Sequence, residues 1–406
     1  MKNITFIICL LLVSTWLKAQ DLQSYIQEAE VNNPQIQAFE LRYNISQEKV
    51  SELNTLPNTT VSAGYFVSEP ETRTGAQRAR FSVSQMLPWF GTITVRQNYA
   101  ASMANVDYVE IAIAKRKLAL AVAKSYYQLY AIVAKQKVLE QNIDLLESYE
   151  RMALTSVEVG KASAVDVLKL QIRQNDMEQQ REVLEQVYMA EKSNFNNLLN
   201  RKETISIDVV TELTIPLEDP LYSSDGLELN PEILKYDEMF ESIMQSDLLN
   251  KKDGAPNIGF GLDYIPVQER PDMSFEDNGK DIVMPMLTFS IPIFNNRIKS
   301  VSKQNKMRLK ETELQKSERI NWLQTTLAKA EAGRNEARIK YNTQKVNLVQ
   351  AGNAEEILMK NYETGTINFN DVLDIQELQL KFQMNSIEAI EAYYGQSAVI
   401  NYFTNQ

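Results

Sequence analysis

The acidic side chains that could act on a solute lie where long helices are expected to begin. Asp166 opens one such segment, while Asp371 and Asp374 open another and, three residues apart, share one helix face. Carboxylates in the first turn of a helix stabilise it through the helix dipole, which is their ordinary role. If copies of the chain surrounded an axis, the same groups would form a ring that attracts cations and repels anions.

The side chains of most catalytic and metal centres are missing. The sequence has no histidine, and its single cysteine, Cys9, lies in an apolar N-terminal run that we expect to be removed. Ser-His-Asp and Cys-His nucleophiles, thiolate metal sites and disulfides are therefore excluded. The five methionines between Met239 and Met286 carry thioethers that can bind Cu(I), but methionine is more often a packing residue. We expect no enzyme, no catalytic residues, no cofactor and no metal site.

Charge and the N-terminus indicate an exported protein that does not bind nucleic acid. The formal net charge is −11, so a phosphate backbone would be repelled. Lys2 precedes the apolar run from Ile4 to Val13, and a small residue, Ala19, stands before Gln20. This arrangement is typical of a secretory signal peptide, so we expect residues 1–19 to be cleaved on export from a bacterial cytoplasm.

Proline placement predicts two stretches of very long helix. All 12 prolines lie between Pro34 and Pro88 or between Pro216 and Pro292, leaving residues 89–215 and 293–406 without any. Because proline breaks helix interiors, a helix over 92–157 is predicted, about 100 Å long at ~1.5 Å per residue. Such a helix needs a partner along its length, and we expect the segment after Gly160 to return antiparallel to it.

Apolar stripes on both segments predict how that hairpin packs. The outgoing stripe consists of Val122, Leu129, Ile132, Leu139, Ile143 and Leu146. The expected returning stripe consists of Val165, Leu168, Ile172, Leu184, Val187, Phe195 and Leu198.

The sequence contains an internal duplication. Glu158 to Gln171 matches Glu363 to Gln376 at an offset of 205, with Glu, Gly, Asp, Val, Leu and Gln identical. Asn33-Pro34 and Asn230-Pro231 open the two halves. We therefore expect a first structural repeat over 20–200, a linker over 201–229 and a second repeat over 230–406.

Each half also contains two short segments that alternate between apolar and small or polar residues, the pattern of half-exposed strands. The clearest example places Ile258, Phe260, Leu262 and Tyr264 on one face. Two soluble hairpins packed on a helix layer would give the same alternation. The long charged connections over 68–79 and 266–281 favour membrane strands instead. Four strands cannot close a barrel, since bacterial barrels begin at about eight, so several copies would have to complete one.

The order of these parts resembles the TolC-like outer-membrane efflux protein family over nearly the whole mature chain. The resemblance is carried by the paired Asn-Pro motifs, by Gln85-Met-Leu-Pro-Trp-Phe-Gly91 and Ser290-Ile-Pro-Ile-Phe294 after the strands, and by two Gly-x5-Asp-Val-Leu hairpins. It implies a mainly α-helical fold with a small β part: long antiparallel coiled-coil helices that form an α-barrel in a homotrimer, and four strands per chain that contribute to a 12-stranded transmembrane β-barrel. It also implies an outer-membrane location, with the helical part in the periplasm, and as partners a periplasmic adaptor protein and an inner-membrane pump.

The same resemblance assigns roles to the hairpin turns. It places Asp166, Asp371, Asp374 and Tyr362 at a periplasmic gate, although Ile367 stands where relatives can carry a gate-locking arginine. The implied adaptor contacts are Val159, Gly160, Lys161, Thr364, Gly365 and Thr366.

The predicted function is a passive exit duct of a tripartite efflux or export system that moves small molecules, metal ions or drugs out of the cell. The alternative is a periplasmic coiled-coil spacer protein without channel activity, which the same helices would also suit. The cargo does not follow from the sequence, because a wide duct need not bind what it passes.

Overall fold

A computed structural model of the chain describes residues 22–160, 163–220, 227–272, 274–293, 296–364, 366–367 and 369–404. The predicted signal peptide lies outside the described residues, as do Lys161 and Gly365. Seven helices are described: α2 (Leu22–Asn32), α3 (Pro34–Glu52), α4 (Thr92–Glu158), α5 (Ala164–Leu198), α6 (Pro231–Asp253), α7 (Asn296–Glu363) and α8 (Phe369–Thr404). The strands are β1 (Thr60–Tyr65), β2 (Glu71–Thr72), β3 (Gly75–Gln77), β4 (Ala79–Leu87), β5 (Asn257–Ile265), β6 (Val267–Gln268) and β7 (Ile282–Ser290).

The proline-free stretches form the long helices that were predicted. α4 has 67 residues and α7 has 68, and each is followed after a short turn by an antiparallel helix, α5 or α8. Neither helix contains proline, so every interior amide can donate to the preceding turn. Among the described residues, no helix is both long enough and apolar enough to cross a membrane.

The chain divides into two compact units, and each unit takes segments from both halves of the sequence. Unit 1 consists of the described parts of Met1–Ala38, Ile111–Asn230 and Ile320–Gln406. Unit 2 consists of the described parts of Phe39–Glu110 and Pro231–Arg319. The boundaries of the two sequence repeats remain a prediction.

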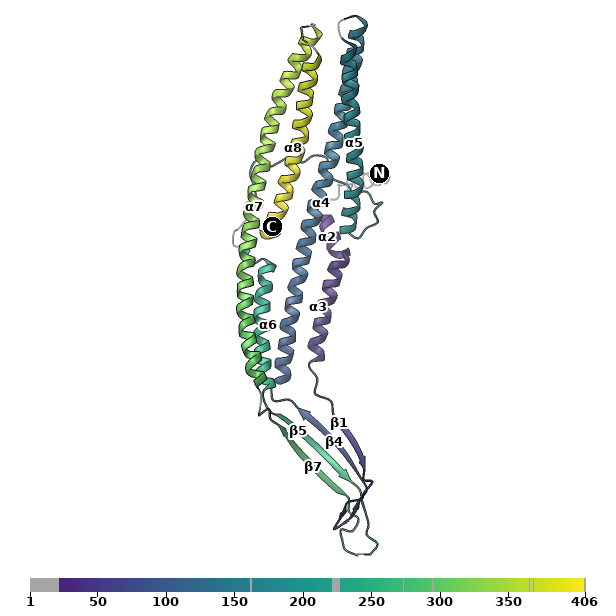
Figure 1. The fold of residues 1–406 in the computed structure, drawn as a ribbon, viewed down its shortest axis with the longest axis vertical. Coiled ribbons are helices and arrows are strands. Elements are labelled where there is room, and N and C mark those ends of the chain that lie inside the picture. Colours follow the sequence, from purple (N-terminus) through teal and green to yellow (C-terminus); the bar gives the residue numbers. More distant parts are fainter. Residues whose placement is uncertain are drawn as a thin grey trace, which may run out of the picture. The chain divides into compact units, whose positions relative to one another are not determined.

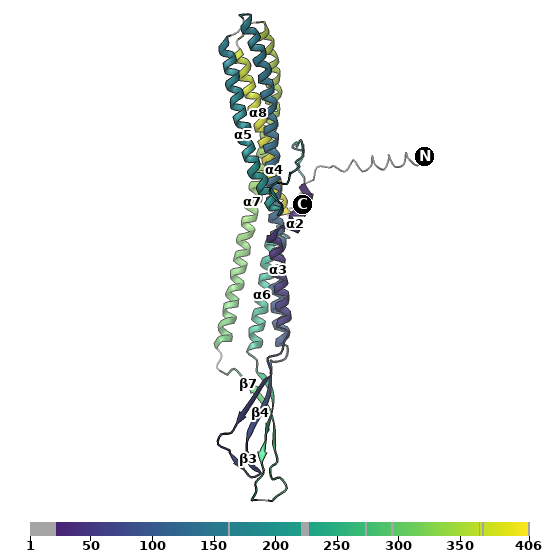
Figure 2. The ribbon, with the colours of Figure 1, turned by 90° about the vertical axis from the view of Figure 1, so that its right-hand side faces the viewer.

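Unit 1 contains two helix hairpins, the part of α4 from Ile111 with α5 and the part of α7 from Ile320 with α8, which turn at the same end of the unit (Figures 1 and 2). The outgoing stripe on α4 is buried as predicted, with Val122, Leu129 and Leu139 fully inaccessible. Near the turns this stripe shares one core with the first turns of α5 and α8, including Leu170 and Phe369.

The returning stripe was predicted on the wrong face of α5. Val165, Leu168 and Ile172 are more than half exposed, and the hairpin is closed instead by a set displaced around the helix. That set consists of Val167, Leu170 and Met177. Among the predicted residues, only Phe195 is fully buried and Leu184 packs partly against the core.

The paired Asn-Pro motifs have a shared structural reason within unit 1. The amide of Asn33 donates to the carbonyl of Leu198 at 2.9 Å, and that of Asn230 donates to the carbonyls of Tyr402 and Phe403. Each asparagine therefore satisfies carbonyls at the end of a returning helix that would otherwise have no intrahelical partner.

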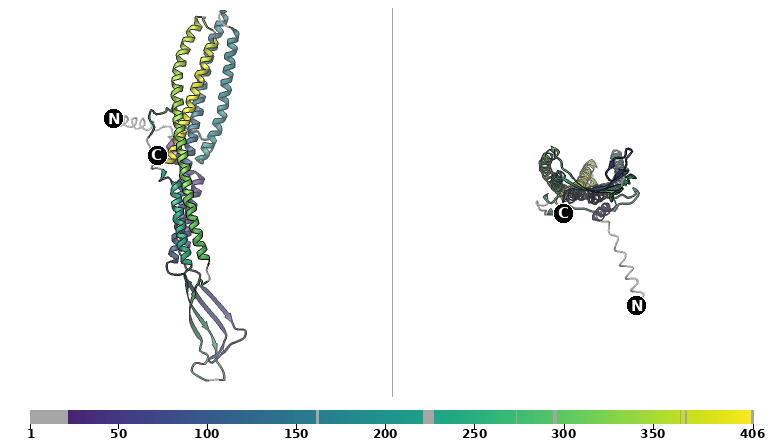
Figure 3. Two further views of the ribbon diagram at one scale, coloured as in Figure 1. Left: turned by 60° about the vertical axis from the view of Figure 1, so that its left-hand side comes forward. Right: turned by 90° about the horizontal axis from the view of Figure 1, so that it is seen from below.

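Unit 2 contains a four-stranded antiparallel sheet in the order β1-β4-β5-β7 (Figure 3). The two halves of the sequence meet in the middle, where β4 pairs with β5, and β1 and β7 are the edges, each with one partner strand among the described residues. The charged connections were expected to be loops, but they also form a small sheet in the order β2-β3-β6.

The register places apolar side chains in rows on one face of the larger sheet. Val61, Val83 and Leu262 are aligned across β1, β4 and β5, and all three are at least 48% exposed. The next row turns Ser62, Ser82 and Asp263 to the opposite face. One face is thus apolar but uncovered, while the other is more polar, with serines, glycines and Asp263 beside Met86, Met284 and Met286.

Candidate functional site: the hairpin turns of unit 1

The first turn is built by a positive backbone angle and a capping box. Gly160 has φ 72°, in the region that favours glycine, and its amide donates to the carbonyl of Val157 at 2.9 Å. Ser163 then caps α5: its hydroxyl accepts from the amide of Val165 at 3.2 Å. Asp166 completes the box by accepting from the amide of Ser163. Asp166 therefore stabilises the start of α5, whatever else it does.

The second turn is held by two hydroxyl groups. Thr364 and Thr366 both donate from their side chains to the carbonyl of Asn361, at 2.9 and 2.8 Å, and the amide of Thr366 donates to it as well. Both threonines are exposed, as is Val159 in the first turn. The predicted adaptor contacts that the structure describes are therefore accessible on the surface.

Asp371 and Asp374 lie in the first turns of α8, and both are exposed. Ion pairs and hydrogen bonds hold the neighbouring surface together: Lys169 donates to the side-chain oxygen of Asn370 at 2.7 Å, and Arg173 pairs with Glu377 at 2.5 Å. The starts of α5 and α8 therefore lie against each other, so the structure brings the segments that carry the three predicted gate acids together.

Tyr362 packs inward rather than toward those acids. Its ring meets that of Phe369 edge-on at 4.8 Å, against the core shared by the helices. Its hydroxyl is buried and has no hydrogen-bond partner among the described residues. The predicted gate tyrosine therefore makes no hydrogen bond to Asp371 or Asp374 here.

A duplicated carboxylate clamp joins the two helices of each hairpin. In the first hairpin, Gln171 and Gln174 of α5 donate to the two oxygens of Glu150 at 2.7 and 3.1 Å. In the second hairpin the three equivalent residues, each 205 positions later, make the same contacts: Gln376 and Gln379 donate to the two oxygens of Glu355.

The two clamps differ in one contact. Tyr149 on α4 is buried, and its hydroxyl donates to Glu355 at 2.6 Å, which connects the first hairpin to the second. Burial raises the pKa of Tyr149, and the hydrogen bond to Glu355 raises it further, so the phenol stays protonated. The residue equivalent to Tyr149 in the second half is Ala354, which has no such group.

Sequence reasoning missed both clamps. The alignment of the two halves included Gln171 and Gln376, but it began at Glu158 and Glu363. Glu150 and Glu355 lie before those positions, on the outgoing helices, and were not compared. Extending the same offset back into the outgoing helices would have found the glutamates.

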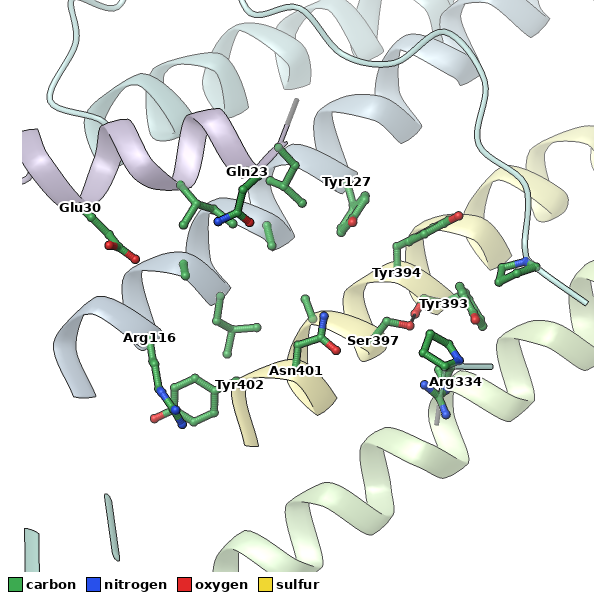
Figure 4. Close-up of a pocket in the computed structure, with 18 residues that line it drawn as sticks. Gln23, Glu30, Arg116, Tyr127, Arg334, Tyr393, Tyr394, Ser397, Asn401 and Tyr402 are labelled. Atoms are coloured by element: carbon green, nitrogen blue, oxygen red, sulfur yellow. Dashed lines mark hydrogen bonds between the residues drawn. The ribbon is translucent and has the colours of Figure 1, made fainter. Parts of the chain in front are cut away.

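A cavity of about 560 Å³ opens elsewhere in unit 1, between α2, α4, α7 and α8 (Figure 4). Its wall includes the segment from Pro216 to Pro220, which was predicted as a linker. There Asp219 accepts a hydrogen bond from Tyr393 at 2.6 Å and pairs with Arg334 at 3.4 Å and with Arg338.

These contacts give the cavity wall a structural role. Burial opposes ionisation of Asp219, but the hydrogen bond from Tyr393 and the two guanidinium groups outweigh it and hold the pKa of Asp219 below its usual value. Burial and the hydrogen bond to Asp219 raise the pKa of Tyr393 to about 12. The described residues contain no group of three or more acidic side chains placed to hold a metal ion.

The fold with these two helix hairpins and a four-stranded sheet is the fold of TolC-type outer-membrane channels. CusC, whose crystal structures concern folding and transmembrane channel formation, is 14% identical with a TM-score of 0.77, over 96% of this chain and 92% of that chain. The outer membrane protein VceC of Vibrio cholerae is 15% identical with a TM-score of 0.76, over 96% and 97%. The open-state outer membrane channel MtrE of Neisseria gonorrhoeae is 15% identical with a TM-score of 0.75, over 94% and 88%.

These likenesses confirm, for the fold, the resemblance that the duplicated motifs indicated. No protein-family model matches the chain, and neither does any curated protein sequence. At such low identity the solved structures establish the architecture, while transport and assembly have to be argued from the residues of this chain.

Proposed function

We propose that this protein is a passive exit duct of the outer membrane, active as a homotrimer. The observation that carries the proposal is the larger sheet of unit 2. Its edge strands, β1 and β7, each have one partner strand among the described residues, and one of its faces carries exposed apolar side chains. An isolated sheet of this kind would aggregate in water, whereas sister copies could pair with its edges and lipid could cover its face. Three copies would supply 12 strands, enough for a closed barrel.

The helices support self-association as well. The exposed stripe of Val165, Leu168 and Ile172 on α5 is apolar and lies beside the turn, where a neighbouring copy would bury it. Arranged around an axis, the long helices of three copies would enclose a tube that continues the barrel in the periplasm. We expect a periplasmic adaptor to bind the exposed turns, and an inner-membrane pump to supply the energy for moving small molecules, metal ions or drugs.

Within this duct, Asp166, Asp371 and Asp374 are the proposed gate carboxylates, with Tyr362 packed behind them. The adaptor contacts are proposed at Val159, Gly160, Lys161, Thr364, Gly365 and Thr366. Because Asp371 and Asp374 are exposed, three copies would present at least six carboxylates to passing ions.

Fractionation followed by electrical recording tests the proposal. The protein should remain with the outer membrane and be released by detergent, and the purified trimer should give discrete, cation-preferring conductance in planar bilayers. Recovery in the soluble periplasm as a protein without conductance would contradict the proposal and favour a coiled-coil spacer.

A further inference from the structure

Positive charge is concentrated just after the last strand of unit 2. From Ile282 to Lys310 the sequence contains six basic residues and no acidic residue, in a chain whose net charge is −11. The six are Arg297, Lys299, Lys303, Lys306, Arg308 and Lys310. All lie in the first four turns of α7 and all are exposed.

The start of α7 adjoins exposed apolar groups. β7 ends at Ser290, and Ile291 and Ile293 that follow it are 59% and 78% exposed. The end of α6 lies at the same place, because Asn250 donates to the carbonyl of Ile298 at 2.9 Å.

An aromatic turn lies at the end of α6. The ammonium of Lys252 donates to the carbonyl of Phe90 at 3.1 Å, and the Phe90 ring is 76% exposed with Trp89 packed edge-on against it. Cations, exposed isoleucines and an aromatic pair therefore occur together at one end of the sheet.

The cations nearest the sheet form no ion pairs in the part of the chain that the structure describes. Arg297 and Lys299 have no carboxylate partner among the described residues, whereas Lys310, farther along the helix, pairs with Glu313 at 2.7 Å. Exposed cations without a carboxylate, placed beside uncovered apolar and aromatic groups, match the composition of a membrane interface.

We propose that Lys252, Arg297 and Lys299, the proximal trio, bind the phosphates of anionic phospholipids at the membrane surface beside the sheet. The inference rests on the proposed membrane location and adds a lipid partner to it. Guanidinium groups bind phosphate through paired hydrogen bonds, and lysine contributes a point charge on a long apolar stem.

Distance along α7 limits the site to its first turn. The headgroup layer is roughly 5–8 Å thick on each side of the hydrocarbon, and charges are screened beyond about 8 Å in physiological salt. Lys306 lies ten residues from Asn296, or about 15 Å along the helix, and Lys310 about 21 Å. Lys306, Arg308 and Lys310, the distal trio, are therefore a matched control with the same number of charges.

The test uses the full-length protein, transferred from detergent into vesicles of phosphatidylcholine alone or mixed with phosphatidylglycerol and separated by flotation. The native protein should prefer the mixed vesicles, and high salt should remove the preference. K252Q/R297Q/K299Q should lower the preference by roughly tenfold, since each cation near an anionic surface contributes to binding. K306Q/R308Q/K310Q should retain it.

Each contrary result has a distinct meaning. Equal losses in the two triple variants would overturn the site, because charge at any position would then suffice. Equal partition of the native protein into both kinds of vesicle, or a preference that persists unchanged in high salt, would also overturn it while leaving the duct intact. Failure to enter either kind of vesicle would count against the proposed function itself. Gln retains amide donors for the carbonyl of Phe90, and helical content measured by circular dichroism separates lost binding from lost folding.

Discussion

The hydroxyl of Tyr149 donates to the carboxylate of Glu355 at 2.6 Å, a contact that joins the two hairpins of one chain across 206 sequence positions. The same carboxylate accepts hydrogen bonds from the side-chain amides of Gln376 and Gln379 on α8, so three donors converge on one acidic group. In the first hairpin Glu150 accepts hydrogen bonds from two glutamines, and no tyrosine among the described residues donates to it. The duplicated chain therefore uses one clamp to close a hairpin and the other to close a hairpin and link it to its neighbour.

Removing this phenol should weaken unit 1. Y149F deletes a buried hydrogen bond to a charged acceptor, so the free energy of unfolding should fall by about 1–3 kcal/mol. Denaturant unfolding of the detergent-solubilised protein measures the loss.

A double-mutant cycle with E355Q tests whether the loss belongs to this contact. The two changes should be non-additive, because E355Q replaces the charged acceptor of this hydrogen bond with a neutral amide and so removes its charge-assisted strength. Additive losses would mean that the effect of Y149F does not arise from its contact with Glu355. The ring of residue 149 packs against Phe369, with centroids 5.8 Å apart, and this packing is present with either side chain.

The long helices could be predicted from the sequence because proline breaks a helix at its own position, so proline-free stretches mark where long helices can form. The packed face of α5 could not be predicted in this way. α5 has two apolar faces, and periodicity does not say which one meets α4. Val167 and Leu170 are buried because they meet a core that also includes α8, a contact invisible in the pattern of one hairpin. The strands were predictable from their alternation, but the pairing of β4 with β5 joins distant segments whose register no local pattern sets.

The predicted gate acids and the two carboxylate clamps show the same limit in the candidate site. Acidic residues at helix starts are visible in sequence, and Asp166 does complete the capping box of α5. Glutamate and glutamine on a long helix are typical of a solvated face, so the clamp of Glu355 with Gln376 was overlooked. Only the shared offset of 205 distinguished these residues from ordinary surface positions.

Two glycines with open surroundings should respond to alanine in opposite directions. An added Cβ meets nothing within 4 Å at Gly160 or at Gly352, so space does not decide the outcome. Gly160 has φ 72°, which an alanine adopts at a cost, and G160A should destabilise the protein by about 1 kcal/mol. Gly352 lies inside α7, and G352A should stabilise it by about 0.5–1 kcal/mol.

The melting temperatures of the two variants, measured side by side, check this prediction. Destabilisation by both substitutions would show that a Cβ at Gly352 disturbs a neighbouring copy.

Asp219 should make the free energy of unfolding depend on pH in the acidic range. The folded-state pKa of Asp219 lies below its ordinary value, so its contribution is present above that ordinary value and is lost as the pH falls through the lowered one. D219N should therefore destabilise the protein at pH 7 and make little difference at a pH below the folded-state pKa. Unfolding at both pH values measures the effect.

D176N is the matched control, because Asp176 is an exposed acid with no hydrogen bond or ion pair among the described residues. It should change stability little at either pH. A loss for D219N that is the same at both pH values would contradict a role for the charge.

The exposed stripe on α5 should be needed for self-association. L168N/I172N places amides where a neighbouring copy is proposed to cover apolar side chains, and it should shift the purified protein from trimer toward monomer in light scattering. L217N is the control, since Leu217 is 98% exposed and lies in the segment between the halves. A double variant that remains fully trimeric would remove this stripe from the proposed interface.

The last prediction separates the two roles open to the acids of α8. A carboxylate in the first turn stabilises a helix by about 0.3–1 kcal/mol, so this contribution, made by Asp371, should be lost in D371N/D374N whatever the function. If the same groups face the ions in a threefold assembly, the variant should also lower the cation-over-anion permeability ratio by about twofold or more. Bilayer recordings under a salt gradient measure that ratio, with D176N as the control that removes an exposed acid far from the turn. A stability loss with unchanged selectivity would leave Asp371 as a residue that stabilises the start of α8 and would exclude both acids from the gate.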